Sequence, residues 1–249
     1  MTALFIAFLA LMVAIIVTLI AHYLNKQTAV IVLAAICLWF IYATLLGYLG
    51  VLKNTAIRPP GIAFLLFPTL VFLLVVVVLV VRLPASARLA VVVPLWIILG
   101  IQCFRIAVEL FLYQLWNVGL VPRMLTFDGA NVDIYFGVSA PLIAWLSTRG
   151  RFGLQIALAW SALGILSVAN VVTRAVLTSP GPLNLIHAEV PNRILSTLPF
   201  LFIPGFLVPL AVSLHVLAIR IILIRLRTPP PDAVSSDRGR APKPSTANL

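Results

Sequence analysis

"FRIAVELFLYQLWNVGLVPRMLTFDGANVDIYFG", residues 104–137, places charged side chains inside an apolar helical pattern. Arg105 and Glu109 lie one helical turn apart in the apolar run, and Asp128, Asn131 and Asp133 follow shortly after it. The chain is 63% hydrophobic and only 9% charged, so these groups are concentrated in one short region. Because a charge at the centre of a bilayer costs about 2.5–3.5 kcal/mol on insertion scales, we expect them to contact one another.

The surrounding sequence is that of an all-α membrane protein. The mean hydropathy is +1.18, and apolar windows long enough to cross about 30 Å of hydrocarbon recur along all but the last part of the chain. We predict a seven-transmembrane helix bundle in residues 1–227, followed by a disordered tail in 228–249 that is rich in proline, serine and charge. The predicted spans are 2–22, 28–52, 62–82, 89–116, 131–147, 153–177 and 194–219.

The first and the fifth predicted spans each have an alternative interpretation. The first has no basic region in front of it and no convincing cleavage site, so we interpret it as a retained helix instead of a signal peptide. The fifth, 131–147, is short and contains Pro141, so a re-entrant or tilted segment is the alternative to a full span.

The basic residues predict the orientation of the bundle. One set of loops contains Lys26, Arg82, Arg88, Arg149, Arg151, Arg220, Arg225 and Arg227, and the other contains Lys53, Arg58, Arg123 and Arg193, offset by Asp128 and Glu189. By the positive-inside rule the first set is cytoplasmic, so the N-terminus is outside and the C-terminus is cytoplasmic. We expect a multi-pass protein of the cell inner membrane. The formal charge of +11 is therefore explained by topology, and a nucleic-acid partner is not expected.

The candidate binding residues lie in the predicted extracytoplasmic half. Gln102, Arg105 and Glu109 share one face of the fourth predicted helix, and Asn170 and Arg174 lie at the outer end of the sixth. The candidates are Arg105, Glu109, Asp128, Asn131, Asp133, Asn170, Arg174, His187 and Arg193. We predict that Arg105 pairs with Glu109, and that both face an outward-opening, water-filled cavity together with Asp133 and Arg174.

Each of these residues also has a purely structural interpretation. Arg174 and Arg193 lie near helix ends, where an arginine side chain can snorkel to the interface. Asn131 suits the N-cap of the fifth predicted helix, and Asp133 is favourable in its first turn. A buried network around Arg105 can also serve only to fix helix packing.

The sequence predicts no cofactor and no metal site. A retinal protein needs a lysine inside its last helix, whereas the lysines here are Lys26, Lys53 and Lys243. A zinc hydrolase needs convergent ligands, and His187 is predicted on the side opposite to His22 and His215. Haem ligation by His22 and His215 is compatible with their predicted side, but no spacing motif supports it.

Three stretches carry a family resemblance: "FRIAVEL", "LTFDGANVDIYFGVSAP" and "PNRILSTLPFLFIPGFLVPLAVSLH". They resemble a family of uncharacterised bacterial integral membrane proteins, over most of residues 100–217. The resemblance implies a polytopic membrane protein and no particular activity, substrate or cofactor.

Three functions fit this sequence. The first is an outward-facing, charge-compensated polar pocket that binds or transports a small polar or anionic solute. The second is a membrane enzyme acting on a lipid-linked substrate at the extracytoplasmic face, with Glu109 or Asp133 as general base and Arg105 or Arg174 on a phosphate. The third is a non-catalytic assembly or scaffold subunit. The expected partners are accordingly the lipid bilayer and a small polar or anionic solute or lipid headgroup, with a second membrane protein as the partner that the third function implies.

Overall fold

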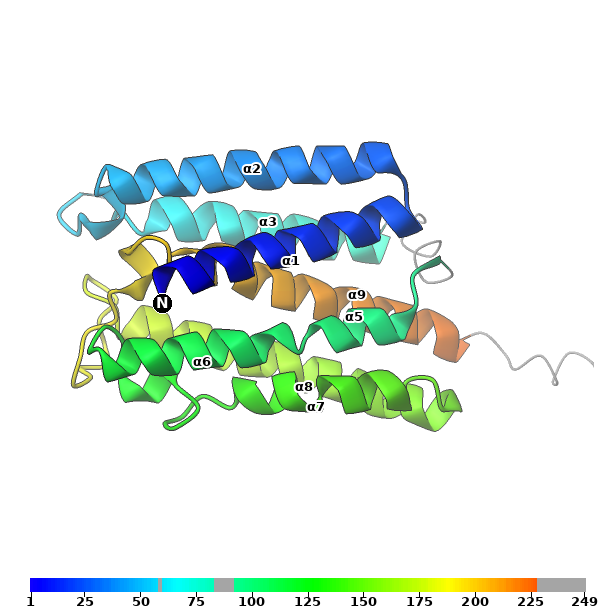
Figure 1. The fold of residues 1–249 in the computed structure, drawn as a ribbon. Coiled ribbons are helices and arrows are strands. Elements are labelled where there is room, and N and C mark those ends of the chain that lie inside the picture. Colours follow the sequence, from blue (N-terminus) through cyan, green and yellow to red (C-terminus); the bar gives the residue numbers. More distant parts are fainter. Residues whose placement is uncertain (58–59, 83–91, 228–249) are drawn as a thin grey trace, which may run out of the picture.

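The computed structural model describes residues 1–57, 60–82 and 92–227, and these residues form helices joined by turns and short loops (Figure 1). The predicted disordered tail, Arg58 and Arg88 lie outside the described residues. Within these residues, six helical segments are long and apolar enough to cross a membrane, and two of them, Leu95–Asn117 and Ile203–Arg227, consist of two elements each. The chain is therefore a multi-pass, all-helical membrane protein. The α-helices are α1 (Thr2–Tyr23), α2 (Lys26–Tyr48), α3 (Ala63–Arg82), α5 (Leu95–Ile101), α6 (Phe104–Asn117), α7 (Asp133–Leu146), α8 (Gly150–Leu177) and α9 (Val208–Arg227).

Helices α1, α2 and α3 are apolar around most of their circumference, as expected for helices that face lipid. Helix α1 turns back into α2 within two residues, and the Asn25 side chain caps α2 by accepting from the Thr28 backbone N–H at 2.7 Å. The inward side of α1 is anchored by Phe5, whose ring packs against Phe111 and Phe200 with centroids 5.1 and 4.9 Å away.

The fourth predicted span, 89–116, is wrong as one continuous helix. Its described part is divided into α5 and α6 by a turn at Gln102 and Cys103, where the backbone bonds are of the tighter i→i+3 type. The break changes the direction of the helix just before Arg105, as the two ribbons show (Figure 1).

The fifth predicted span, 131–147, contains only the 14-residue helix α7, about 21 Å long and too short for a full crossing. The non-helical segment before α7 runs back alongside α6. Phe127 stacks on Tyr113 at 5.0 Å, Asn131 bonds Glu109, and Asp133 bonds Arg105, so successive residues of the segment meet successively deeper turns of α6. Helix α7 ends beside the start of α5, at the end of the bundle opposite to the end of α6. The non-helical segment and α7 together therefore run the length of the bundle, and the alternative of a re-entrant segment is wrong for this region.

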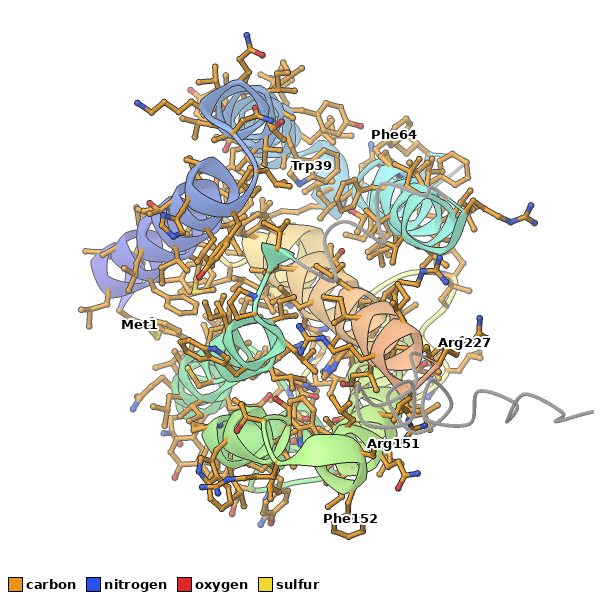
Figure 2. The ribbon with its side chains drawn as sticks, turned by 90° about the vertical axis from the view of Figure 1, so that its right-hand side faces the viewer. Met1, Trp39, Phe64, Arg151, Phe152 and Arg227 are labelled. Atoms are coloured by element: carbon orange, nitrogen blue, oxygen red, sulfur yellow. The ribbon has the colours of Figure 1, made fainter. Side chains whose placement is uncertain are left out.

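The seventh predicted span, 194–219, is shifted along the chain. A short 3-10 turn, Ile194–Ser196, is followed by a π-helical turn, Ile203–Leu207, that leads into α9. Helix α9 packs against α3, α5 and α8, and the end view shows it in the middle of the bundle (Figure 2). Because of this central position, the side chains of α9 contact several helices.

Candidate functional site

Arg105 is the centre of a buried polar network between α6, α7, α8 and α9. Its Nε donates to Asp133 Oδ2 at 2.8 Å, and its second terminal nitrogen forms an ion pair with Asp133 Oδ1. The first turn of α7 thus presents a carboxylate to the guanidinium in a two-pronged arrangement. Ser167 of α8 also donates to Asp133 Oδ1, at 2.6 Å. The prediction that Arg105 pairs with Glu109 is wrong, because among the described side chains Arg105 forms its ion pair with Asp133.

Glu109 belongs to the same network through Asn131. The Asn131 Nδ2 donates to Glu109 Oε1 at 2.6 Å and to the Leu125 carbonyl at 2.9 Å, while its Oδ1 accepts from the Asp133 backbone N–H at 2.9 Å. The Asn131 side chain therefore forms an Asx turn directly before α7. The prediction that Asn131 is the N-cap of this helix is wrong by one residue, because Val132 occupies the cap position. The prediction of Asp133 in the first turn is confirmed.

His215 of α9 completes the network at its far side. Arg105 donates from its remaining terminal nitrogen to His215 Nε2 over 3.0 Å, and a guanidinium has no acceptor atom. The Nε2 atom must therefore accept, which places the imidazole proton on Nδ1. The imidazole lies against Gly164 of α8, where a Cβ atom would overlap the ring, and Trp160 packs edge-on to it at 5.2 Å.

The network is closed off from the surroundings. Arg105 and Glu109 are each 1% exposed, His215 is 0% exposed, and the Asp133 side chain is 13% exposed. Six buried side-chain atoms have no hydrogen-bond partner among the described residues, and three of them belong to this region: Glu109 Oε2, Gln102 Oε1 and His215 Nδ1. Leaving a buried polar atom unpaired costs about 1–3 kcal/mol.

Asn170 and Arg174 form a second polar pair on α8. The Arg174 Nε donates to Asn170 Oδ1 at 2.9 Å, and Asn170 Nδ2 donates to the Ala130 carbonyl at 3.4 Å. This pair reaches the non-helical segment directly before Asn131. In the described structure this pair borders the network and makes no hydrogen bond to Arg105 or Glu109.

The remaining candidates lie at the surface. Asp128 accepts from Arg123 Nε at 3.0 Å in an exposed ion pair, and His187 and Arg193 are exposed in the loops between α8 and α9. These three residues are outside the network, and their part in binding stays a prediction.

Sequence reasoning missed His215, Gly164 and Ser167 as parts of the network. The helical pattern of α9 does place His215 one turn after Ala211, whose carbonyl accepts from Gln102 Nε2 at 3.0 Å. Its depth and its facing partner are properties of the assembled bundle and leave no local signal.

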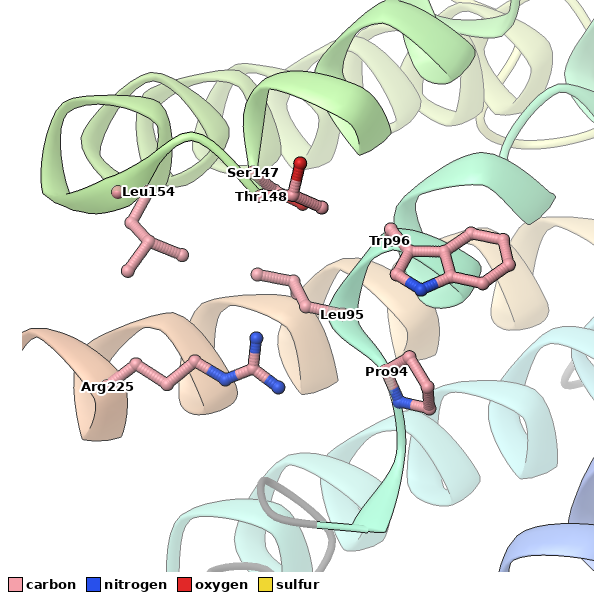
Figure 3. A pocket seen from close by; sticks show the side chains of 8 residues that line it. Pro94, Leu95, Trp96, Ser147, Thr148, Leu154 and Arg225 are labelled. Atoms are coloured by element: carbon pink, nitrogen blue, oxygen red, sulfur yellow. The ribbon is translucent and has the colours of Figure 1, made fainter.

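Three pockets of the described structure lie away from the network. The first, of about 500 Å³, is at the end of the bundle that contains the α7–α8 turn (Figure 3), and the second, of about 760 Å³, is an apolar groove beside it. The third, of about 330 Å³, is at the opposite end and includes Lys53 and Arg193. The predicted cavity at Arg105 is not among these three pockets.

A family described as a domain of unknown function (DUF8737) matches residues 59–223, about two thirds of the chain. The chain belongs to this family. Comparisons with curated proteins and with solved structures gave no match. The matched range includes every residue of the polar network, whereas α1 and α2 lie outside it.

Proposed function

We propose that this member of the DUF8737 family is a transport protein that binds a small polar solute in the network around Arg105 and Asp133. The observation that carries the proposal is the set of unpartnered buried atoms, Glu109 Oε2, Gln102 Oε1 and His215 Nδ1, next to an ion pair at membrane depth. Intramembrane ionisable groups that face the interior of a bundle typically mark a solute or ion pathway.

The chemistry of the unpartnered atoms selects the solute class. Two of them, on Glu109 and Gln102, are acceptors, and only His215 Nδ1 is a donor. Each of the three nitrogens of Arg105 has one protein partner, and the two terminal nitrogens each keep a second N–H. Because the Arg105 charge is paired with Asp133, the site suits a solute with N–H or O–H donors better than an anion, and the second carboxyl group, on Glu109, can balance a positive charge on that solute.

Broken secondary structure supports the same function. The α5–α6 break and the non-helical segment before α7 both adjoin Arg105, and a π-helical turn precedes α9. Non-helical backbone at membrane depth is tolerated where it is buried in protein or lines a polar pathway. We propose that the solute enters from the end of the bundle that holds Asn170 and Arg174, through movement of the segment before Asp133.

The orientation completes the proposal: an inner-membrane protein with the N-terminus outside and the C-terminus cytoplasmic, so that this entry faces outward. A reporter active only outside the cytoplasm should be active when inserted after Arg123 and silent after Arg227. The reverse pattern would place the entry on the cytoplasmic side.

The enzyme hypothesis assigned Arg105 or Arg174 to a substrate phosphate, and the Arg105 charge is already paired with Asp133. An assembly subunit is the second candidate, because an Arg105 bonded at each of its three nitrogens is also what a rigid packing element requires. A transport protein binds a solute in the network, whereas an assembly subunit does not.

The test uses proteoliposomes with an internal pH-sensitive dye and a panel of amines, amino acids, polyols and organic acids. We expect a donor-bearing solute to give a flux that Glu109→Gln abolishes and Asp128→Asn preserves, because Asp128 is exposed and outside the network. If no panel member gives flux, and mass spectrometry finds no copurified polar molecule, the transport proposal fails and the assembly function stands.

A further inference from the structure

We propose that the end of the bundle carrying the α7–α8 turn binds an anionic phospholipid. The phosphate headgroup would lie in the pocket beside Arg225, and one acyl chain in the adjoining apolar groove. This site is separate from the polar network and does not depend on the transport proposal.

The headgroup pocket places one cation, Arg225, and two hydroxyl side chains, Ser147 and Thr148, in an otherwise largely apolar wall at a helix boundary. Its volume is about 500 Å³, and Figure 3 shows Arg225 extending from α9 toward Leu95, with Ser147 and Thr148 on the facing side. The wall is held together by Arg151, which donates to the Leu226 carbonyl at 2.7 Å and so ties the start of α8 to the end of α9.

The acyl groove begins where the pocket ends. It has a volume of about 760 Å³, lies between α1, α5, α6 and α7, and shares Trp96 and Thr148 with the headgroup pocket. Its lining is almost entirely apolar, with Gly100 and Ala144 providing small surfaces. A pocket that contains a cation and hydroxyl groups, continuous with an apolar groove, matches the order of headgroup and acyl chain in a phospholipid.

Charge at this end favours an anionic lipid. Arg227 follows Arg225 by two residues, and Arg149 and Arg151 lie at the start of α8, which Arg151 ties to the end of α9. Arg149 stacks on the Trp145 ring at 4.3 Å. The four acidic residues of the described chain lie elsewhere, two in the network and two exposed at the opposite end: Glu109, Asp133, Asp128 and Glu189. Basic pockets between membrane helices recognise anionic headgroups in this way, and tryptophans are common at the same depth.

The test is native mass spectrometry of the full chain in detergent, titrated with dioleoyl phosphatidylglycerol or dioleoyl phosphatidylcholine. We expect phosphatidylglycerol to bind more tightly. Arg225→Gln should weaken it roughly fivefold, the effect of one basic residue near an anionic surface, whereas Arg225→Lys and Arg193→Gln should retain it. Arg193 is the control because it is exposed at the opposite end of the bundle and does not line the headgroup pocket.

The groove has its own matched pair of variants. Cys103 and Cys37 are both free and exposed, but only Cys103 lines the groove. Cys103→Trp should fill the groove and reduce phosphatidylglycerol binding, and Cys37→Trp should not. This pair also tests the proposal if Arg225→Gln fails to fold.

Three results would overturn the lipid site. Equal binding of the two lipids would remove the headgroup selectivity, and unchanged binding in Cys103→Trp would remove the groove. If glycerol 3-phosphate or inorganic phosphate competes as strongly as the whole lipid, the site takes a free anion and the acyl chain plays no part.

Discussion

The first two helices, α1 and α2, and the last five, α5–α9, differ in how much of their surface is buried within the protein. In α2, 11% of the residues in the apolar window are buried within the protein, whereas in the α5–α6 pair the share is 50%. The α1–α2 hairpin exposes large side chains such as Leu4 and Leu38, while α6 buries Arg105 and Glu109. The family match covers the second region and omits the first.

This difference shows where specificity resides. Lipid tails are as apolar as leucine, so exposed aliphatic side chains on α2 are interchangeable. A buried guanidinium cannot be exchanged in this way, because each of its hydrogen bonds needs a particular partner at a particular depth in the bundle. We therefore expect substitutions in α5–α9 to change the free energy of unfolding far more than matched substitutions in α1–α2.

The largest effect should come from Asp133. Asp133→Leu strands the Arg105 charge inside the bundle and should lower the free energy of unfolding by about 3–5 kcal/mol in a detergent unfolding titration. The double change Arg105→Met with Asp133→Leu should regain much of this loss, since an apolar pair replaces the ion pair. Asp128→Leu, at the exposed ion pair, should cost under about 1 kcal/mol. Equal losses at positions 128 and 133 would contradict the buried pair.

A pair of leucines compares the two regions directly. Leu99 in α5 is 1% exposed and Leu38 in α2 is 69% exposed. Leu99→Ala should cost about 2 kcal/mol through the cavity that it leaves, and Leu38→Ala under about 0.5 kcal/mol. The measurement is the same unfolding titration. A comparable loss at Leu38 would show that α2 is covered by another protein surface and not by lipid.

Gly164 tests the contact between α8 and α9. An added Cβ would overlap the His215 imidazole, so Gly164→Ala should lower the free energy of unfolding by about 1–3 kcal/mol. Gly100→Ala is the control, because the nearest atom to its added Cβ is Ala144 Cβ at an ordinary 3.7 Å. That change should be neutral or slightly stabilising. The measurement is the thermal unfolding temperature of both variants. A higher unfolding temperature for Gly164→Ala would contradict the close contact between Gly164 and the His215 ring.

The smallest effect should come from the rim pair. Arg174→Met removes one half-buried hydrogen bond to Asn170 and should cost about 0.5–1.5 kcal/mol. Arg193→Met, at an exposed position, should change stability less than this in a side-by-side melt. If Arg193→Met had the larger effect, the loop between α8 and α9 would contribute more than the rim pair.

The sequence by itself determined the class of the protein. Apolar windows of sufficient length predict membrane helices because the thickness of the hydrocarbon sets their length, and α1, α2, α3 and α8 begin and end within a few residues of the predicted spans. The pattern in residues 102–109 also predicted which face of α6 is polar, because 3.6 residues per turn is a local property of the chain.

Only the tertiary structure decided which polar side chains meet. Arg105 bonds Asp133 and His215, 28 and 110 residues away, and the predicted neighbour Glu109 bonds Asn131 instead. These pairings depend on how deeply the segment before α7 enters the bundle and on the central place of α9. Hydropathy records that a residue is costly to bury, but the identity of its partner is set by depth and rotation in the packed bundle, which are not local properties.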